Sequence, residues 1–249
     1  MEKIYETILY PWILIAIISF ISLLKINAPY GKFFNKNFGF SLPYKLGWFI
    51  QEIISPLSLF IFYFLSTKNF ENKIVWFFLL IWISHYIYRS IIFPLRMGKN
   101  SSRIPMLVIM SAVTFNIVNG FINGYYLGTT NYNNAYYLEY NFIIGLVFVI
   151  IGFYINFKSD NTLIALKAKN KGYLVPEGNM YNYISCPNYF GEMIEWLGFS
   201  IMTLSFPAFI FFIWTVANLF PRALATHKWY KEEFNNYPKH RKAIIPFII

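Results

Sequence analysis

The chain has 249 residues, of which 57% are hydrophobic, 22% are aromatic and only 13% are charged. A soluble domain carries about 25% charged residues, so this composition excludes an ordinary soluble protein and indicates an integral membrane protein. The net charge of +10 is the kind of balance that nucleic-acid-binding proteins show. Here, however, the basic residues cluster at the ends of apolar runs, so we expect a lipid bilayer as the partner and no nucleic acid.

Seven apolar spans follow one another along the chain, and each is close to the ~20 residues that cross a bilayer. The first span has no strong basic segment and no cleavage site, so we expect a retained helix and no signal peptide. The spans are residues 8–24, 46–65, 74–95, 104–127, 141–157, 187–204 and 206–225. This pattern predicts an all-α bundle of seven transmembrane helices, which forms one membrane-embedded domain over residues 1–249.

The distribution of Lys and Arg predicts the orientation of the bundle. Of the 21 basic residues, 17 fall in the connections after spans one, three and five and in the tail, against only Lys3, Lys68 and Lys73 on the other side. Because positively charged loops stay in the cytosol, we expect the N-terminus outside or in the lumen and the C-terminus in the cytosol. The expected location is the endoplasmic reticulum for a eukaryotic host and the inner membrane for a bacterium. A monomer is expected.

Several ionisable side chains lie inside the predicted spans, where each is a candidate functional residue. Glu52 follows Gln51 in the second span, and a helix points these neighbours about 100° apart, so only one of them can aim straight at a given target. His85 and Arg89 lie in the third span. The histidines are too scattered to indicate a metal site, and the single cysteine, Cys186, rules out an intramolecular disulfide.

The sixth span carries a polar stripe. Asn188, Glu192 and Glu195 are spaced i, i+4 and i+7, so they share one face of a helix. A carboxylate at bilayer depth costs about 2.5 to 3.5 kcal/mol, so the stripe is expected to face the bundle interior or a ligand cavity. A hydrogen-bonded clasp between helices is the alternative.

Polar side chains also gather at the expected cytosolic ends of the spans. Asn156 and Asp160 lie at the end of span five, where a helix C-cap is one interpretation. The spacing of Arg222, Thr226 and Tyr230 places them on one helical face after span seven, with His227 beside them, and an interfacial belt is the alternative there. Together with Asn188, these groups suit a phosphate-bearing ligand. Neither a GxGxxG nor a GxxxxGK[ST] motif occurs to supply such a site.

Seven motifs are distributed over nearly the whole chain. They are PYGK (29–32), WFIQE (48–52), HYIYRS (85–90), NGFINGYYL (119–127), NFKSD (156–160), PNYFGEMIEWLGF (187–199) and PRALATHKWYKEEFNNYPKHRKAIIPF (221–247). In order and spacing these motifs resemble those of the steroid 5α-reductase family, the 3-oxo-5α-steroid 4-dehydrogenases.

The resemblance implies a seven-helix membrane reductase that uses NADPH to saturate the 4,5 double bond of a 3-oxo-4-ene steroid. Glu52 and Tyr86 are the implied catalytic residues, which hydrogen-bond the 3-oxo group. The substrate-binding residues are expected to be Trp48, Gln51, Arg89 and Ser111. The residues expected around NADPH are Tyr30, Lys32, Lys99, Asn156, Asp160, Lys167, Tyr173, Asn188, Tyr189, Glu192, Arg222, Thr226, His227 and Tyr230.

The chemistry of an enone fits the implied roles of Glu52 and Tyr86. Hydride delivered to the β-carbon drives negative charge onto the carbonyl oxygen, so the site needs hydrogen-bond donors aimed at that oxygen. Tyr86 can donate from its phenol. Glu52 can donate only when it is protonated, and burial favours that neutral form.

The sequence departs from the family pattern at four positions. Ser111 and Leu174 stand where some relatives have basic residues, while Lys99 and Lys167 replace arginines and lose bidentate phosphate geometry.

Two alternatives to a steroid reductase remain open. One alternative is an enoyl-CoA or polyprenol-type membrane reductase. Against the CoA version, we expect no soluble domain ahead of the first helix, and WFIQE fits the steroid group better. The other alternative is a non-catalytic sterol-binding membrane protein.

Overall fold

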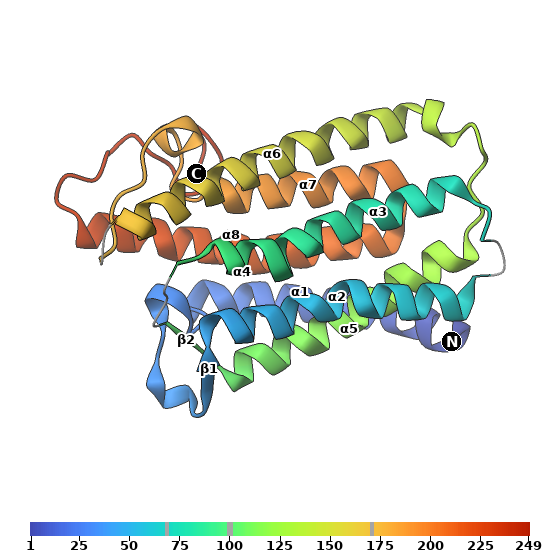
Figure 1. The fold of residues 1–249 in the computed structure, drawn as a ribbon, viewed down its shortest axis with the longest axis horizontal. Coiled ribbons are helices and arrows are strands. Elements are labelled where there is room, and N and C mark those ends of the chain that lie inside the picture. The colour runs from blue at the N-terminus through green and yellow to red at the C-terminus, as the bar shows by residue number, and fades with distance from the viewer. Residues whose placement is uncertain (68–69, 99–101, 170–171) are drawn as a thin grey trace.

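Long helices run side by side along one axis of the molecule (Figure 1). The structure is a computed structural model that describes residues 1–67, 70–98, 102–169 and 172–249. The long helices are α1 (Glu2–Lys25), α2 (Tyr44–Ser66), α3 (Lys73–Ile87), α5 (Met106–Thr129), α6 (Tyr140–Lys169), α7 (Pro187–Thr203) and α8 (Phe206–Glu233). The shorter elements are 3-10 turns at Gly31–Phe33, Lys36–Phe38, Tyr136–Leu138 and Asn179–Asn182, a π-helical turn at Tyr88–Ile92, α4 (Phe93–Arg96), and an antiparallel ribbon of β1 (Ser41–Pro43) and β2 (Arg103–Pro105).

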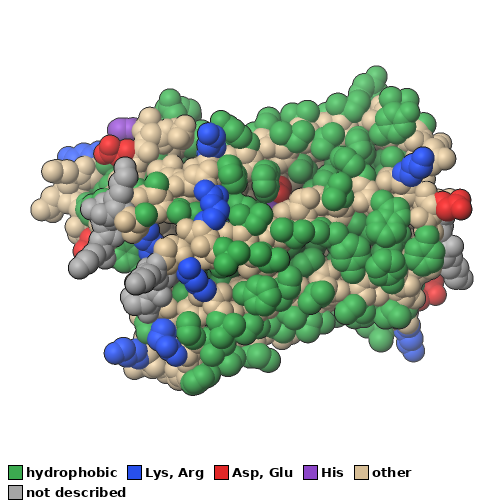
Figure 2. Space-filling view, viewed as in Figure 1, with side chains coloured by type: hydrophobic (Ala, Val, Ile, Leu, Met, Phe, Trp, Pro, Cys, Tyr) green, Lys and Arg blue, Asp and Glu red, His purple; other side chains and the backbone are tan. Residues whose placement is uncertain are grey.

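The expectation of a helical membrane bundle agrees with the helix lengths. Within the described ranges, six helices are long and apolar enough to cross a membrane, counting α3 and α4 as one continuous segment. The remaining expected helix, α7, has 17 residues and is not among these six. Hydrophobic side chains cover the flank of the molecule, and on this face most Lys and Arg side chains gather toward the end that carries β1 and β2 (Figure 2). The seven-span count and the orientation stay predictions.

The structure corrects several predicted helix bounds. Ile104 belongs to β2 and not to a helix, because it precedes Pro105, and a residue before proline disfavours the helical conformation. Helices α6 and α8 both continue beyond the predicted ends at residues 157 and 225. Hydropathy detects only their apolar part, whereas the polar turns that follow still form helix. Asp160 therefore lies inside α6, and the C-cap interpretation is wrong.

Helices α6 and α7 pack backbone against backbone through glycines. A Cβ placed on Gly198 would lie 2.6 Å from the backbone nitrogen of Val149, and one on Gly191 would lie 2.6 Å from that of Asn156. Small residues allow this close approach between membrane helices. The contact between Gly191 and Asn156 places the polar residues of α6 directly beside those of α7.

Replacing Gly198 by alanine is expected to lower the free energy of unfolding by about 1 to 3 kcal/mol, because the new methyl group must push the two helices apart. Thermal and denaturant unfolding in detergent measure the change. Gly98→Ala is the matched control, since a Cβ there meets nothing within 4 Å among the described residues. Equal stability of the two variants would contradict the close packing of α6 and α7.

The turn between α7 and α8 is short and specific. Leu204 adopts the left-handed conformation with φ of 47°, and the Ser205 hydroxyl accepts a hydrogen bond from the Ala208 backbone N–H at 3.3 Å. Pro207 stands in the first turn of α8, where its missing N–H costs nothing. The turn returns the chain antiparallel, so that α7 and α8 form adjacent walls.

Candidate active site

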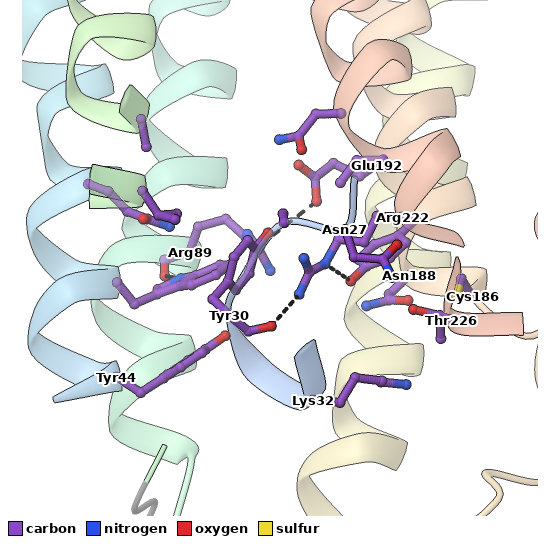
Figure 3. A pocket seen from close by; sticks show the side chains of 18 of the residues that line it. Asn27, Tyr30, Lys32, Tyr44, Arg89, Cys186, Asn188, Glu192, Arg222 and Thr226 are labelled. Atoms are coloured by element: carbon purple, nitrogen blue, oxygen red, sulfur yellow. Dashed lines mark hydrogen bonds and ion pairs between the residues drawn. The ribbon is translucent and has the colours of Figure 1, made fainter. Parts of the chain in front are cut away.

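A cavity of about 730 Å³ opens within the bundle at the end that carries β1 and β2. Its walls come from α1, α2, α3 with the π-helical turn that follows it, α5, α6, α7 and α8, together with the segment that connects α1 to β1 and with residues 172–186 before α7. Figure 3 shows Arg89 on one wall and Asn188, Glu192 and Arg222 on the opposite wall, with Tyr30 and Lys32 on the connecting segment. This volume lies in the range of about 300 to 1,000 Å³ that is typical of small-molecule and cofactor sites.

Most of the side chains proposed from the sequence line this one cavity. They are Tyr30, Lys32, Trp48, Gln51, Glu52, Tyr86, Arg89, Ser111, Asp160, Lys167, Tyr173, Asn188, Tyr189, Glu192, Arg222, Thr226 and Tyr230. Asn156 does not line the cavity but supports it, because its amide donates to the Asn188 carbonyl at 3.0 Å and to Glu192 Oε2 at 3.4 Å. His227 is also absent from the lining and instead contacts Ser185, with Nδ1 2.5 Å from the hydroxyl. Lys99 lies outside the described residues.

Helix α2 contributes a polar group of neighbouring side chains to the cavity. The Gln51 amide donates to Glu52 Oε1 at 3.3 Å, and both of these adjacent residues line the cavity. Gln51 Oε1 is buried and finds no hydrogen-bond partner within the described part of the chain. The Trp48 indole donates to the Arg89 carbonyl at 3.0 Å and ties α2 to the third helix.

A π-helical turn interrupts the third helix beside Tyr86. It covers Tyr88–Ile92 and continues α3 into α4. Such turns insert an extra residue into the helical register and are frequent at functional sites. The side chains of Tyr86 and Arg89, before and inside the turn, both line the cavity.

Arg89 joins the two sides of the cavity electrostatically. Its guanidinium lies 3.4 Å from Asp160 Oδ2 and 4.0 Å from Glu192 Oε2. Asn188 in turn donates to Asp160 Oδ1 at 3.4 Å. Arg89, which the sequence assigned to the substrate side, therefore pairs with Asp160 and Glu192, which it assigned to the cofactor. We infer that this network fixes α3, α6 and α7 relative to one another.

Arg222 lines the cavity and carries an unpartnered donor. Its Nε donates to the Tyr189 hydroxyl at 3.0 Å and its Nη2 to the Tyr30 carbonyl at 3.4 Å. The guanidinium also lies 3.6 Å from the centre of the Tyr30 ring. The third nitrogen, Nη1, is buried without a hydrogen-bond partner in the described ranges. A buried guanidinium N–H with no partner is well suited to an anionic oxygen.

Lys32 lies over aromatic rings at the cavity mouth. Its Nζ is 4.2 Å from the centre of the Trp229 ring and 4.3 Å from that of Tyr230. The pKa of Lys32 falls from 10.5 to about 8, chiefly because burial disfavours the charged amine; Cys186 opposes the shift and the positive charge of Arg222 adds to it. The mouth therefore holds a cation that loses its proton in mildly alkaline solution.

Several lining residues escaped the sequence reasoning. Phe211, Thr215 and Asn218 extend the stripe of Arg222, Thr226 and Tyr230 back along α8 at helical spacing. Tyr44 precedes Trp48 by one turn of α2 and stacks on it, with ring centres 5.5 Å apart. Extending the α8 stripe back by three turns, and the α2 face of Trp48 back by one turn, would have found these residues. Cys186 also lines the cavity, and burial raises the pKa of its thiol to about 12.

The fold and the cavity define a membrane-type helical bundle with an internal ligand site that combines apolar helix faces with cationic groups at its mouth. Residues 102–249 match the family described as 3-oxo-5-alpha-steroid 4-dehydrogenase. The chain is 38% identical to the steroid 5-alpha-reductase DET2 of Arabidopsis thaliana over 265 residues, covering 100% of both chains. It is 37% identical to the corresponding DET2 protein of Gossypium hirsutum, covering 99% of this chain and 98% of the relative. Identity to the 3-oxo-5-alpha-steroid 4-dehydrogenase 1 of Rattus norvegicus is 32%, covering 94% of this chain and 91% of the relative.

The chain belongs to the 3-oxo-5-alpha-steroid 4-dehydrogenase family. It is therefore an oxidoreductase of that type, and the resemblance seen in the motifs is confirmed.

Proposed function

We propose that the protein reduces the 4,5 double bond of a 3-oxo-4-ene steroid to the 5α-3-oxosteroid, with NADPH as the reductant. The observation that carries this proposal is the single cavity that brings Glu52 and Tyr86 together with the cationic groups of Arg222 and Lys32. The first pair suits an enone carbonyl, and the second suits the phosphates of a dinucleotide. The names of the relatives support the steroid as the substrate class.

The residues at the mouth fit a phosphate-bearing cofactor. Arg222 offers a buried nitrogen without a partner in the described chain, and Lys32 adds a second cation nearby. On the same wall as Arg222, Asn188 and Glu192 provide amide and carboxylate groups that can hold the nicotinamide end. Asn156 supports both of these residues through hydrogen bonds. When bound, NADPH would supply the hydride that adds to C5 of the steroid.

Tyr86 and Glu52 would stabilise the charge that develops on the steroid. We propose that the Tyr86 hydroxyl and a protonated Glu52 donate hydrogen bonds to the 3-oxo oxygen as electrons move from the double bond toward it. The Gln51 amide, which lies 3.3 Å from Glu52 Oε1, would orient that carboxyl group. A proton from solvent would then complete C4.

Apolar faces of α1 and α5 suggest a path for the steroid from the lipid. The two helices are joined toward the N-terminal end of α1, where the Trp12 indole donates to Asn119 Oδ1 at 3.3 Å. Farther along α1, Ile18 and Leu23 line the cavity, as do Leu107 and Val108 near the start of α5. Both Ile18 and Leu107 are more than half exposed. We propose that the steroid enters between these helices.

The pKa of Lys32 predicts how cofactor binding depends on pH. Because a phosphate favours the protonated amine, the bound complex holds a proton that the free protein loses above pH 8. We expect the Kd for NADPH to rise about twofold between pH 7 and 8 and then to approach a tenfold rise per pH unit. Titration of protein in detergent, followed by the cofactor's fluorescence, measures this dependence. Lys32→Arg should flatten the profile, and an unchanged profile in that variant would exclude Lys32 as the cause.

A turnover assay with purified protein tests the proposed function. We expect NADPH-dependent loss of the enone absorbance with 3-oxo-4-ene steroids, and little reduction of enoyl-CoA or polyprenol substrates. Tight binding of a steroid without NADPH binding or turnover would favour the non-catalytic alternative. Reduction of only the CoA or polyprenol substrates would replace the proposed substrate class.

A further inference from the structure

A buried acid and base pair lies beside the cavity but does not line it. His85 Nδ1 and Glu195 Oε1 are 2.8 Å apart, and both side chains are only 3% exposed. The pair joins α3 to α7 across 110 residues of sequence. Neither residue belongs to the cavity lining, so neither can touch a substrate or a cofactor there.

Stability alone does not explain this pair. Taking two ionisable groups out of water costs several kcal/mol per ion when they are charged, and buried pairs are often no better than apolar residues of the same volume. The Glu195 carboxyl is also incompletely satisfied, because Oε2 is buried without a hydrogen-bond partner in the described chain. Because the pair is retained at this cost, we look for a neighbouring side chain that it positions.

The residue next to the pair is Tyr86. The His85 ring lies edge-on to the Tyr86 ring, with centres 5.1 Å apart, and edge-on to Trp196 at 4.8 Å. Trp82 stacks on Tyr86 with ring centres 5.8 Å apart and is anchored by donating from its indole to Ser55 Oγ at 3.1 Å. Tyr86 is thus enclosed by aromatic rings on α3 and α7, and the hydrogen bond between His85 and Glu195 fixes one side of that enclosure.

We propose that Glu195 and His85 are positioning residues that hold the Tyr86 hydroxyl in its donating orientation toward the substrate carbonyl. The proposal rests on the proposed function, because it assigns the pair to Tyr86. Its mechanism is geometric: the bond across α3 and α7 fixes the His85 ring, and this ring together with Trp196, whose ring centre lies 6.1 Å from that of Tyr86, restricts the Tyr86 ring. Two χ angles place a tyrosine hydroxyl, so a loosened enclosure would displace the donor without removing it.

A double-mutant cycle on enone reduction tests this inference. Glu195→Leu is expected to lower kcat at least tenfold in the unmodified background and less than twofold in the Tyr86→Phe background, because coupled residues are not additive. Glu195→Gln keeps a carbonyl acceptor for the imidazole N–H and should restore most of the rate. The matched control is Tyr132→Phe, which removes another buried hydrogen bond to α7, that from the Tyr132 hydroxyl to the Thr203 carbonyl at 2.7 Å. We expect it to act equally in both backgrounds.

A spectroscopic readout without cofactor separates this inference from the reaction itself. The absorbance maximum of an enone moves to longer wavelength when its carbonyl oxygen accepts hydrogen bonds, so a bound 3-oxo-4-ene steroid reports on the Tyr86 donor. We expect Glu195→Leu to reduce this shift as much as Tyr86→Phe does, while Glu195→Gln and Tyr132→Phe retain it. Additive rate effects, or an unchanged shift in Glu195→Leu, would overturn the positioning role. If the unmodified protein shows no shift and no turnover, the proposed function itself fails.

Discussion

Replacing Tyr86 by phenylalanine is expected to lower kcat for steroid enone reduction by about 10²- to 10³-fold, which is the usual cost of removing one donor to a developing oxyanion. The KM for NADPH should change little, because the hydroxyl would act on the steroid carbonyl. Steady-state kinetics with purified protein in detergent or nanodiscs measure both parameters.

Tyr63→Phe is the control for this experiment. Tyr63 is fully buried on α2 and does not line the cavity, and its hydroxyl has no partner in the described part of the chain. Loss of that hydroxyl should leave the reaction rate nearly unchanged. If Tyr86→Phe also turned over at the unmodified rate, Tyr86 could not be the donor, and the second member of the pair, Glu52, would have to stabilise the carbonyl alone.

Replacing Arg222 by glutamine is expected to weaken NADPH binding by about 10- to 100-fold. A hydrogen bond to a charged group contributes about 1.5 to 3 kcal/mol, and each 1.4 kcal/mol corresponds to a factor of ten in Kd. The Arg222 guanidinium is held between Tyr30 and Tyr189, so its free Nη1 is preorganised for an anionic oxygen. Arg222→Lys should retain part of the affinity but lose the planar geometry.

Lys228→Gln is the matched control for the loss of charge on α8. Lys228 lies on the same helix, its side chain is 77% exposed, and it pairs only loosely with Glu232 at 3.8 Å. Calorimetric titration with NADPH should give an unchanged Kd for this variant. Equal affinities for Arg222→Gln and the unmodified protein would remove Arg222 from the cofactor site.

Local pattern was sufficient for much of the fold. The apolar runs predicted the long helices. Helical spacing placed Asn188 and Glu192 on one face of one helix, and Arg222, Thr226 and Tyr230 on one face of another. All five side chains do line one cavity. The bounds of α6 and α8 were missed because hydropathy does not report where a helix continues beyond its apolar part.

Pairings across the bundle were beyond the reach of the sequence pattern. The polar stripe on α7 left open a ligand cavity or a clasp between helices, and the structure shows that it divides between the two. Glu192 lines the cavity, whereas Glu195 pairs with His85 on α3. Which residue takes which role depends on the rotation of α7 against α3 and α6. The close contact of Gly191 with Asn156 sets that rotation, and no single helix encodes it.

The family resemblance supplied roles that geometry has refined. Arg89 was expected on the substrate side, but its guanidinium pairs with Asp160 and Glu192 and so links the substrate wall to the proposed cofactor wall. His227 was expected around NADPH; its ring does not line the cavity but contacts Ser185, which does. Neither arrangement follows from spacing along the chain, because each contact joins segments that are far apart in sequence.

The most direct test of the proposed reaction is the transfer of label from NADPH that carries deuterium at both hydrogen positions of the nicotinamide C4. With purified protein and a 3-oxo-4-ene steroid, we predict that deuterium appears at C5 on the α face of the product, in a reaction that consumes one NADPH per steroid. Mass spectrometry and NMR of the product measure both quantities. Reduced steroid without deuterium at C5, or folded protein that binds NADPH and steroid without reducing the double bond, would contradict the account.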